Sequence, residues 1–401
     1  MHRLKILVLT PGFLPTIGGA EVGVHEIYAR LGKRHRVTIL TEQHRLGGES
    51  ESVLPGFDQS HYEVLRYRDV LNGGRVPGRM LLRGAVPPFS VGALWAADRW
   101  VRKLRPDVVN VHYAAYVGLA AVWIQRAHRV PTILSLVGRD SVPGPLVPRL
   151  WPSWAHQVAR HVAHTVFISE FCQSYHLAQR GSLRSTVIPY GTDTSRIYPQ
   201  PPDRALRAQL DIPDKASVLL SLQRLSLLKH VEVVIQSVQW LVERGRRDFV
   251  LLIAGSGLEA QRLRQLVESL DLWRYVRFLG YLPEPELPRY FALADVFCFS
   301  SIFETFGIVL AQAMSAGLPV VAANSSAVPE VVQHGITGLL SAPLDEGSMG
   351  ANIATLLDNR ALRLRMGEQA RKRATQLYDW NRTASLYERV LCEAVREGRA
   401  G

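Results

Sequence analysis

The sequence predicts an α/β protein built from two doubly wound domains, each with a parallel sheet between layers of helices. Three observations support this prediction. Short apolar runs alternate with segments of helical periodicity through both halves of the chain. Glycine or serine turns follow several of these runs, as is typical where parallel strands end. A stretch with four prolines, 197–213, separates the two series.

In the first half, the expected strands are apolar runs that end in polar or turn-forming residues. They are 5–10, 36–41, 63–67, 108–112, 132–136, 165–169 and 185–189, with helices expected at 20–31 and 98–104. A double glycine, Gly18-Gly19, precedes the first helix and suits close approach of the backbone to a phosphate. Residues 143–154 are rich in proline and tryptophan, which predicts an irregular segment.

The second half repeats this alternation. Strands are expected at 218–222, 249–254, 276–280, 295–300, 320–323 and 339–340, and helices at 231–244, 258–270, 284–294, 308–316 and 380–395. The last helix has apolar residues at helical spacing and needs a surface to cover. The expected domains are therefore 1–196 and 214–377, joined by a linker at 197–213, with residues 378–401 as a helix that packs back on the first domain.

Composition limits the kind of partner. The chain has 401 residues, 47% of them hydrophobic, and a net charge of +12, which favours acidic ligands such as nucleotide phosphates, lipid diphosphates or an anionic membrane. The basic residues are scattered and form no nucleic-acid-binding motif, so nucleic acid is disfavoured. No apolar run approaches the ~18 residues of a membrane span. Three widely spaced cysteines form no metal or disulfide pattern, which fits a reduced, cytoplasmic setting.

The turn Glu304-Thr305-Phe306-Gly307 lies between an expected strand and an expected helix, at the carboxyl edge of a parallel sheet. Ligands bind at such edges. Gly307 lets the backbone approach a ligand, and the free N–H groups that open the following helix suit an anion. A carboxylate in the same turn suits hydroxyl groups. The combination predicts a sugar-nucleotide site, and the alternative is an ordinary turn with a solvated Glu304.

A series of short motifs extends through nearly the whole chain. They are Gly18-Gly19-Ala20-Glu21, Pro106-Asp107 to His112, Ile188 to Asp193, Arg224 with Lys229, Gly255 to Gly257, Phe278 to Gly280, Glu304 to Gly307, Pro329-Glu330 to Gly338-Leu339, and Trp380. In this order and spacing they resemble the family 4 retaining glycosyltransferases (glycosyl transferases group 1). The resemblance implies the GT-B fold, in which two Rossmann-like domains face each other across a cleft.

The resemblance also implies a role for each motif. Arg224 and Lys229 resemble the two cations that clamp the donor diphosphate, which agrees with the need to offset charge on a departing nucleoside diphosphate. The alternative for this pair is a solvated position on a surface loop. Further donor contacts are implied for three loops and the first helix. They are Gly18, Gly19, Gly255, Tyr281, Leu282, Phe306, Gly307, Ile308 and Val309, with Tyr281 and Leu282 beside the nucleobase.

Glu304 resembles the first acid of the EX7E motif, which holds the hydroxyls of the donor sugar. His112 matches the second histidine of an HxH pattern and is a candidate contact for the acceptor, with a packed core histidine as the alternative. The resemblance implies no metal ion and no cofactor besides a GDP-, UDP- or ADP-sugar as substrate. It also implies a retaining hexosyltransferase, in which the leaving phosphate oxygen takes the acceptor proton on the same face of the sugar.

Three positions depart from the family pattern. Gln312 stands where the second acid of EX7E is expected, and an amide lacks the charge that strengthens bonds to ribose hydroxyls. Val137 stands where HGxD has its histidine, and Ser326-Ala327 replaces the usual glycine pair. The departures at Gln312 and Val137 motivate a second hypothesis, a non-catalytic nucleotide-sugar-binding protein. A third hypothesis, an oxidoreductase, is disfavoured because Gly255-Ser256-Gly257 is not followed by an acid at the tip of the next strand.

Two basic stretches predict contact with an anionic membrane surface, from the cytoplasmic side. Residues 75–89 alternate arginines with large apolar residues, and 148–160 add Trp151 and Trp154 between Arg149 and Arg160. Tryptophan and arginine together suit the headgroup boundary. A soluble acceptor and a basic surface with no membrane role is the alternative.

Overall fold

The structure is a computed structural model that describes residues 3–15, 18–43, 58–68, 89–138, 141–144, 150–179 and 182–400. The chain forms two compact units, one of Met1–Tyr190 with Trp380–Gly401 and the other of Gly191–Asp379. The segment expected as a linker, 197–213, lies inside the second unit and contains a helix, α7 (Arg204–Gln209). Arg371 donates hydrogen bonds to the carbonyls of Thr194 and Ile197, which ties the start of this segment to the second unit.

The described part of the first unit contains a seven-stranded parallel sheet in the order β3-β2-β1-β4-β5-β6-β7. Its strands are β1 (Lys5–Thr10), β2 (Arg36–Glu42), β3 (Glu63–Tyr67), β4 (Val108–His112), β5 (Thr132–Leu136), β6 (His164–Phe167) and β7 (Ser185–Val187). Every strand expected in this half is present. The central strands β1, β4 and β5 are almost continuous apolar runs, as strands covered on both faces must be.

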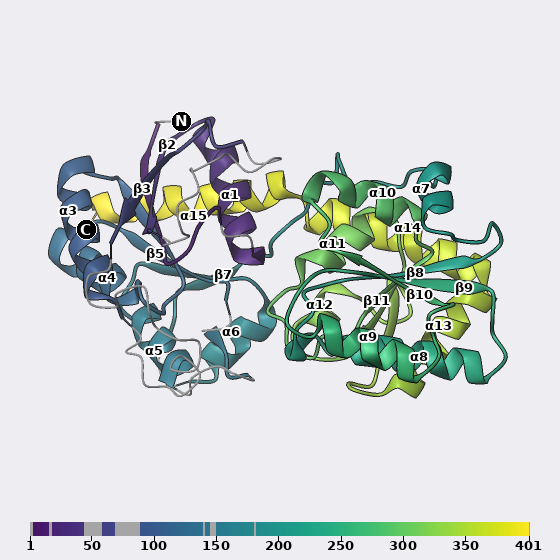
Figure 1. Cartoon of the computed structure of the whole chain (residues 1–401). Coiled ribbons are helices and arrows are strands. Elements are labelled where there is room, and N and C mark those ends of the chain that lie inside the picture. Colours follow the sequence, from purple (N-terminus) through teal and green to yellow (C-terminus); the bar gives the residue numbers. More distant parts are fainter. Residues whose placement is uncertain are drawn as a thin grey trace. The chain divides into compact units, whose positions relative to one another are not determined.

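Helices cover both faces of this sheet (Figure 1). They are α1 (Gly19–Gly32), α3 (Val91–Leu104), α4 (Gly118–Trp123), the π-helical turn η1 (Ile124–His128), α5 (Leu150–Ala159), α6 (Glu170–Leu177) and α15 (Trp380–Ala400). The helices α1 and α15 pack against each other, and α15 also contacts β4 and β5. The helices α3, α4 and α5 form a second, contiguous layer.

One expected element of this unit is corrected. Residues 150–154 were expected to be irregular, but they begin α5. Pro152 is tolerated there because it occupies the first turn, where a backbone N–H has no partner within the helix. The basic segment at 75–88, together with residues 139–140 and 149, lies outside the described residues.

The chain's last helix is anchored in the core of the first unit. The ring of Tyr387 is fully buried and stacks on His112, with ring centroids 6.2 Å apart, and Trp380 contacts Tyr190 at 5.4 Å. Glu388 accepts hydrogen bonds from Arg34 (2.6 Å) and from His35 Nε2 (2.8 Å). These contacts bury one face of α15, as its amphipathic pattern predicts.

The Glu388 contacts predict a pH-dependent loss of stability in Glu388→Gln. Arg34, and then His35, hold the pKa of Glu388 below its usual value. A depressed carboxyl pKa contributes stability above the unfolded pKa, and this contribution is lost as the pH falls through the folded pKa. We expect Glu388→Gln to lower the free energy of unfolding by about 2 kcal/mol at neutral pH. The difference from wild type should shrink at acid pH.

Urea unfolding at neutral and at acid pH measures this effect. Glu397→Gln is the matched control, because Glu397 also lies in α15 and bonds an arginine, Arg184, but does so at an exposed position. Its substitution should change stability far less. An equal cost of Glu388→Gln at both pH values would contradict the prediction.

The described part of the second unit contains a six-stranded parallel sheet in the order β10-β9-β8-β11-β12-β13. Its strands are β8 (Ser217–Leu222), β9 (Phe249–Ala254), β10 (Val276–Gly280), β11 (Val296–Phe299), β12 (Val320–Ala323) and β13 (Gly338–Ser341). Two Rossmann-like α/β units confirm the fold class that the sequence predicts.

Two layers of helices enclose this second sheet as well (Figure 1). Besides α7, they are the short turn η3 (Leu227–Lys229), α8 (Val231–Glu243), α9 (Ala260–Ser269), the short turn η4 (Glu284–Glu286), α10 (Leu287–Leu293), α11 (Ile308–Ser315), α12 (Val328–Val331), α13 (Glu346–Asp358) and α14 (Arg360–Leu377). The helices α8, α9 and α13 bury their apolar side chains in one large cluster with β8, β9 and β11. This rigid core positions the loops at the carboxyl edge of the sheet.

Candidate active site

Three neighbouring strands of the second unit, β8, β11 and β12, end at the same edge of the sheet. The loops after β8 and β11 carry both predicted diphosphate-binding cations and the predicted sugar-binding acid. The loop after β8 contains Arg224 and Lys229, the loop after β11 contains Glu304 and Gly307, and the loop after β12 contains Ser326. Adjacent carboxyl ends are where an open α/β sheet binds its ligand.

Lys229 and Glu304 form an ion pair, although 75 residues separate them in the chain. The side chains are 25% and 12% exposed, respectively, so the pair lies at the surface of the site and is open to a ligand. The Lys229 ammonium also lies 5.8 Å from the centroid of the Phe299 ring. The structure therefore brings together the predicted diphosphate-binding cation and the predicted sugar-binding acid.

Serine hydroxyls at the end of β11 hold the Lys229 loop in place. Ser300 Oγ donates a hydrogen bond to the carbonyl of Lys229 (2.9 Å), and Ser301 Oγ lies 3.4 Å from the carbonyl of Leu228. The Ser300 hydroxyl also accepts a hydrogen bond from the buried amide of Gln223 (3.3 Å). These bonds fix the backbone of the loop that carries the Lys229 side chain.

Arg224 is exposed, and within the described part of the chain its guanidinium has no hydrogen bond or ion pair. Its loop lies directly against the turn after β9. A Cβ added to Gly255 would come within 1.9 Å of the Gln223 carbonyl, and one added to Gly257 within 2.1 Å of the Leu225 carbonyl. Both glycines also have positive φ angles, of 136° and 155°. Gly255 is thus required to hold the Arg224 loop, whether or not it also touches a ligand.

The Glu304 turn has the geometry expected of an anion-binding helix start. Gly307 caps α11 with φ 86° and ψ 73°, a left-handed conformation that favours glycine. The first N–H groups of α11, those of Ile308 and Val309, have no partner within the helix and carry the positive end of its dipole. Phe306 is buried and packs against Tyr378, with ring centroids 5.4 Å apart, and this contact holds the turn against the rest of the second unit.

Ser326 fastens this turn to the neighbouring loop. Its Oγ accepts a hydrogen bond from the Glu304 backbone N–H (2.8 Å) and lies 3.3 Å from the Ile302 carbonyl, while Ser325 Oγ donates to the same carbonyl (2.7 Å). Ser326 has φ 48°, in the left-handed region of the backbone that residues other than glycine rarely adopt. The hydroxyl therefore offsets the strain that replacing a glycine introduces here.

Two substitutions separate these effects. Ser326→Ala removes the hydroxyl but keeps the strained backbone, and we expect it to lower unfolding free energy by about 1 to 2 kcal/mol. Ser326→Gly removes the same hydroxyl and relaxes the backbone, so it should be about 1 kcal/mol more stable than Ser326→Ala. Urea unfolding of the three proteins tests this order. Identical stability of Ser326→Ala and the wild type would show that the hydroxyl contributes nothing.

The other predicted donor contacts occupy varied positions. Leu282 is nearly buried in the loop after β10, and the neighbouring Tyr281 is 57% exposed, as a ring that stacks on a nucleobase would be. Gln312 lies in α11 with a buried side chain. In the first unit, Gly18 caps α1 and Gly19 is its first residue.

His112 packs in the core of the first unit, as the alternative describes, and its contact with an acceptor stays a prediction. Its side chain is 0% exposed, and its Nε2 lies 3.1 Å from the hydroxyl of Tyr28. Burial lowers the pKa of His112 to about 3, because charging the ring in an apolar core is unfavourable. The same network contains Asn110, which donates to Tyr28 (2.6 Å) and accepts from Ser135 (2.9 Å). Sequence reasoning could not separate the alternatives, because α15 covers this edge from far along the chain.

Residues that anchor the site were not identified from the sequence. Ser300 and Ser301 were seen only as the end of a strand, and Ser326 only as a departure from a glycine pair. Paired serines directly after buried strands are the signal that could have indicated loop-anchoring hydroxyls. Val137 is buried after β5. Among the described side chains, no group of three or more His, Cys, Asp or Glu residues could hold a metal ion.

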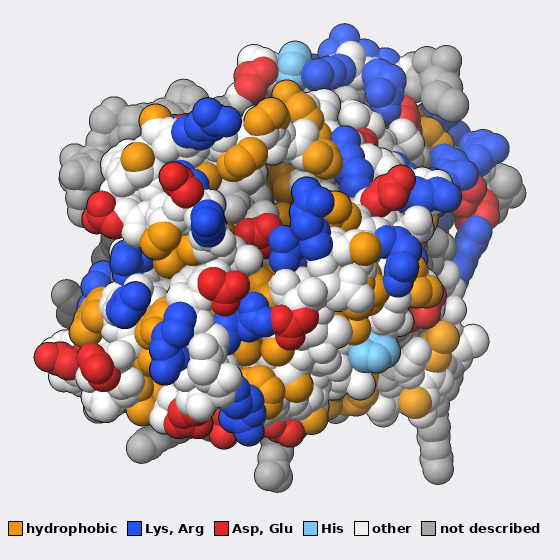
Figure 2. Space-filling model, turned by 90° about the vertical axis from the view of Figure 1, so that its right-hand side faces the viewer, with side chains coloured by type: hydrophobic (Ala, Val, Ile, Leu, Met, Phe, Trp, Pro, Cys, Tyr) orange, Lys and Arg blue, Asp and Glu red, His pale blue; other side chains and the backbone are white. Residues whose placement is uncertain are grey.

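No helix within the described ranges is long and apolar enough to span a bilayer. On the face shown in Figure 2, lysine and arginine side chains are spread among acidic and apolar ones. This agrees with the scattered basic residues of the sequence.

Comparisons with known proteins identify the family. Residues 18–191 match the family described as Glycosyl transferase 4-like domain, and residues 202–373 match Glycosyl transferases group 1. The D-inositol 3-phosphate glycosyltransferase of Kineococcus radiotolerans is 34% identical over 414 residues, covering 96% of this chain and 92% of the relative. The GDP-mannose-dependent alpha-(1-6)-phosphatidylinositol monomannoside mannosyltransferase of Mycobacterium tuberculosis is 27% identical over 397 residues, covering 95% and 96%.

Solved structures show the same fold. HepE of Anabaena, in complex with UDP and glucose, aligns with a TM-score of 0.78 at 21% identity, covering 97% of this chain and 100% of that one. The motifs, the two parallel sheets and these matches agree: the chain belongs to the glycosyl transferases group 1 family, whose structures have the GT-B fold.

Proposed function

We propose that this glycosyltransferase moves a hexose from a nucleoside diphosphate sugar to an acceptor hydroxyl, with retention of the anomeric configuration and without a metal ion. The observation that carries the proposal is the contact between Lys229 and Glu304 at the carboxyl edge of the second sheet. It joins a cation suited to a diphosphate and a carboxylate suited to sugar hydroxyls in one place.

In this proposal the chain's own groups stabilise the leaving diphosphate. Lys229 and Arg224 supply two positive charges, and the free N–H groups at the start of α11 supply a third, partial one. Glu304 accepts hydrogen bonds from the donor sugar. The acceptor hydroxyl forms the new bond to the anomeric carbon as the bond to the phosphate oxygen breaks, and that oxygen takes the acceptor proton. No protein carboxylate then acts as a nucleophile.

A screen with GDP-mannose, UDP-glucose and ADP-glucose tests the function. The correct donor should raise the melting temperature, and NMR of the product should show the donor's anomeric configuration. Activity should survive EDTA. Binding of a donor without transfer to any acceptor tried, including inositol phosphates and phosphatidylinositol mannosides, would favour the non-catalytic hypothesis. An inverted product would disprove retention, and loss of activity in EDTA would disprove metal independence.

We further propose that the first unit contacts an anionic membrane surface, with a tryptophan of α3 as an anchor in addition to those the sequence indicated. Trp154 Nε1 donates to the Ala114 carbonyl (3.0 Å) and Trp151 packs edge-on against Tyr116, and both side chains are half-buried. Trp95 is 77% exposed on α3, with the exposed Arg99 one turn away. An exposed tryptophan beside a basic residue suits a headgroup boundary, and the net charge of +12 adds attraction.

We expect the protein to sediment with anionic but not neutral vesicles, and Trp95→Ser to weaken this association several-fold, since the substitution removes the apolar anchor. Trp273→Ser is the matched control, because Trp273 is a partly exposed tryptophan of the second unit. Salt at high concentration should release the wild type. Protein that stays in the supernatant with anionic vesicles at low salt would rule out the membrane contact.

A further inference from the structure

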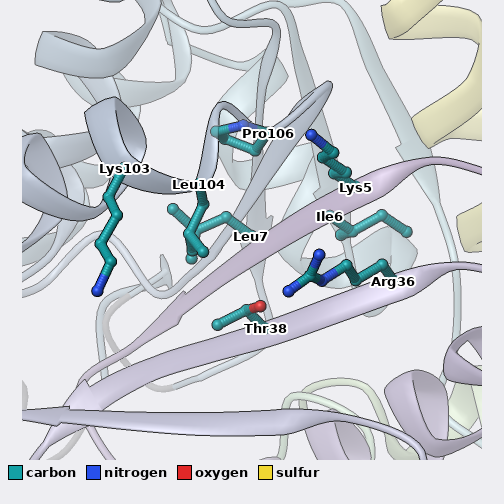
Figure 3. Close-up of a pocket in the computed structure, with 8 residues that line it drawn as sticks. All are labelled: Lys5, Ile6, Leu7, Arg36, Thr38, Lys103, Leu104 and Pro106. Carbon is teal, nitrogen blue, oxygen red and sulfur yellow. The ribbon is translucent and has the colours of Figure 1, made fainter.

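A pocket of about 300 Å³ lies in the first unit, at the amino ends of β1 and β2. Ligands of open α/β sheets bind at the carboxyl ends, so this pocket is separate from the edge at which donor or acceptor would bind. It is lined by Lys5, Ile6, Leu7, Arg36, Thr38, Lys103, Leu104 and Pro106 (Figure 3).

The pocket is bordered by three cations without a described carboxylate partner. Lys5 and Arg36 are paired in register on adjacent strands, about 4.8 Å apart along the sheet. Like charges on neighbouring strands repel each other, and an anion placed between them would offset this repulsion. Lys103 comes from the last turn of α3, where its ammonium lies 4.6 Å from the centroid of the Trp100 ring. Among the described residues, none of the three side chains forms an ion pair.

The carboxylate of Asp107, which follows the lining residue Pro106, already has two partners. Asp107 accepts the Lys5 backbone N–H at Oδ2 (2.8 Å) and the Arg399 guanidinium at Oδ1 (3.1 Å). Neither bond involves the side chain of Lys5 or of Arg36. Glu63 is paired in register with Thr38, one strand further from the pocket, and does not line it.

The other side chains that line the pocket indicate which chemical groups a bound anion would have. Arg36 extends toward the hydroxyl of Thr38, and Lys103 lies on the other side of Leu104 (Figure 3). Ile6, Leu7, Leu104 and Pro106 add apolar surface. A volume of this size is at the lower end of small-molecule sites.

We infer that this pocket is a second anion site of the protein, which binds a phosphate group attached to a small carbon moiety. Arg36 and Lys103 contact the phosphate oxygens, Thr38 donates a hydrogen bond to one of them, and the carbon moiety packs on Leu7 and Leu104. The phosphate belongs either to a soluble phosphorylated molecule or to a lipid headgroup, since both present the same chemistry. The site is independent of the proposed sugar transfer.

Calorimetric titration with phenyl phosphate tests this inference. All proteins carry Arg224→Ala and Lys229→Ala, so that the predicted diphosphate loop does not bind the probe. We expect saturable binding of phenyl phosphate in this background. Adding Arg36→Gln and Lys103→Gln should lower the affinity by about tenfold or more, because each cation makes a charge-assisted contact. Arg102→Gln is the matched control: Arg102 is in the same turn of α3 but pairs with Asp98.

Sedimentation with vesicles that contain phosphatidic acid distinguishes a lipid headgroup from a soluble phosphorylated molecule. If Arg36→Gln with Lys103→Gln reduces sedimentation relative to Arg102→Gln, the ligand is a headgroup. If it changes only phenyl phosphate binding, the ligand is soluble. Two results overturn the inference: no binding of phenyl phosphate in the Arg224→Ala, Lys229→Ala background, or equal binding with and without the Arg36 and Lys103 substitutions.

Discussion

Replacing both Arg224 and Lys229 with alanine is expected to abolish sugar transfer while the protein remains folded. Each side chain is expected to stabilise charge that develops on the leaving diphosphate, and removing one such group costs roughly 100-fold in kcat or more. The two together should therefore lower kcat by about four orders of magnitude if their effects are independent. Arg224 has no bonded partner among the described residues, and Lys229 is partly exposed, so neither is needed for the core.

Initial rates and unfolding midpoints of the same preparations measure this. Arg360→Ala with Lys372→Ala is the matched control, because it removes one exposed arginine and one exposed lysine from the same unit. Lys229→Arg should also be impaired, since a planar guanidinium does not replace a compact ammonium bonded to Glu304. Full activity of the Arg224→Ala, Lys229→Ala protein would show that the diphosphate binds elsewhere.

Glu304→Gln is expected to lower kcat by about 10- to 100-fold and to leave affinity for the nucleoside diphosphate intact or higher. The amide keeps the shape of the side chain but loses the charge that strengthens hydrogen bonds to sugar hydroxyls. The structure adds a reason why the affinity for the nucleoside diphosphate should stay intact or rise. Glu304 holds the Lys229 ammonium in the free protein, so neutralising the carboxylate frees that ammonium for the phosphates.

The coupling between the two residues can be measured directly. In a double-mutant cycle with Lys229→Ala, the effects of Glu304→Gln on diphosphate affinity should not be additive, because the residues are in contact. Glu286→Gln is the control, because Glu286 lies in the same unit and its one ion pair among the described residues is with an exposed arginine, Arg289. Loss of diphosphate affinity in Glu304→Gln equal to the loss in kcat would mean that the carboxylate acts on the phosphates rather than on the sugar.

The elements and the order of the chain were accessible from the sequence. Buried strands such as β4 and β9 are short apolar runs, and the amphipathic spacing of 380–395 predicts a helix that needs a partner surface. These features depend on residues within a few positions of one another, because helical hydrogen bonds are local and a strand covered on both faces must be apolar throughout. The order of the motifs in the sequence predicted the family. The loop with Arg224 and Lys229 and the loop with Glu304 both lie at the carboxyl edge of the second sheet, as predicted.

The contacts between elements were decided only in the folded chain. Lys229 meets Glu304 because β8 and β11 are neighbours in the sheet, which their separation in sequence does not show. His112 ends a strand, as predicted, and α15 covers it with Tyr387, so its side chain packs in the core of the first unit. Ser326 looks like the loss of a glycine until its hydroxyl is seen to bind the Glu304 turn. Whether a polar side chain is exposed, buried or paired depends on what packs over it, and distant segments of the chain supply that covering.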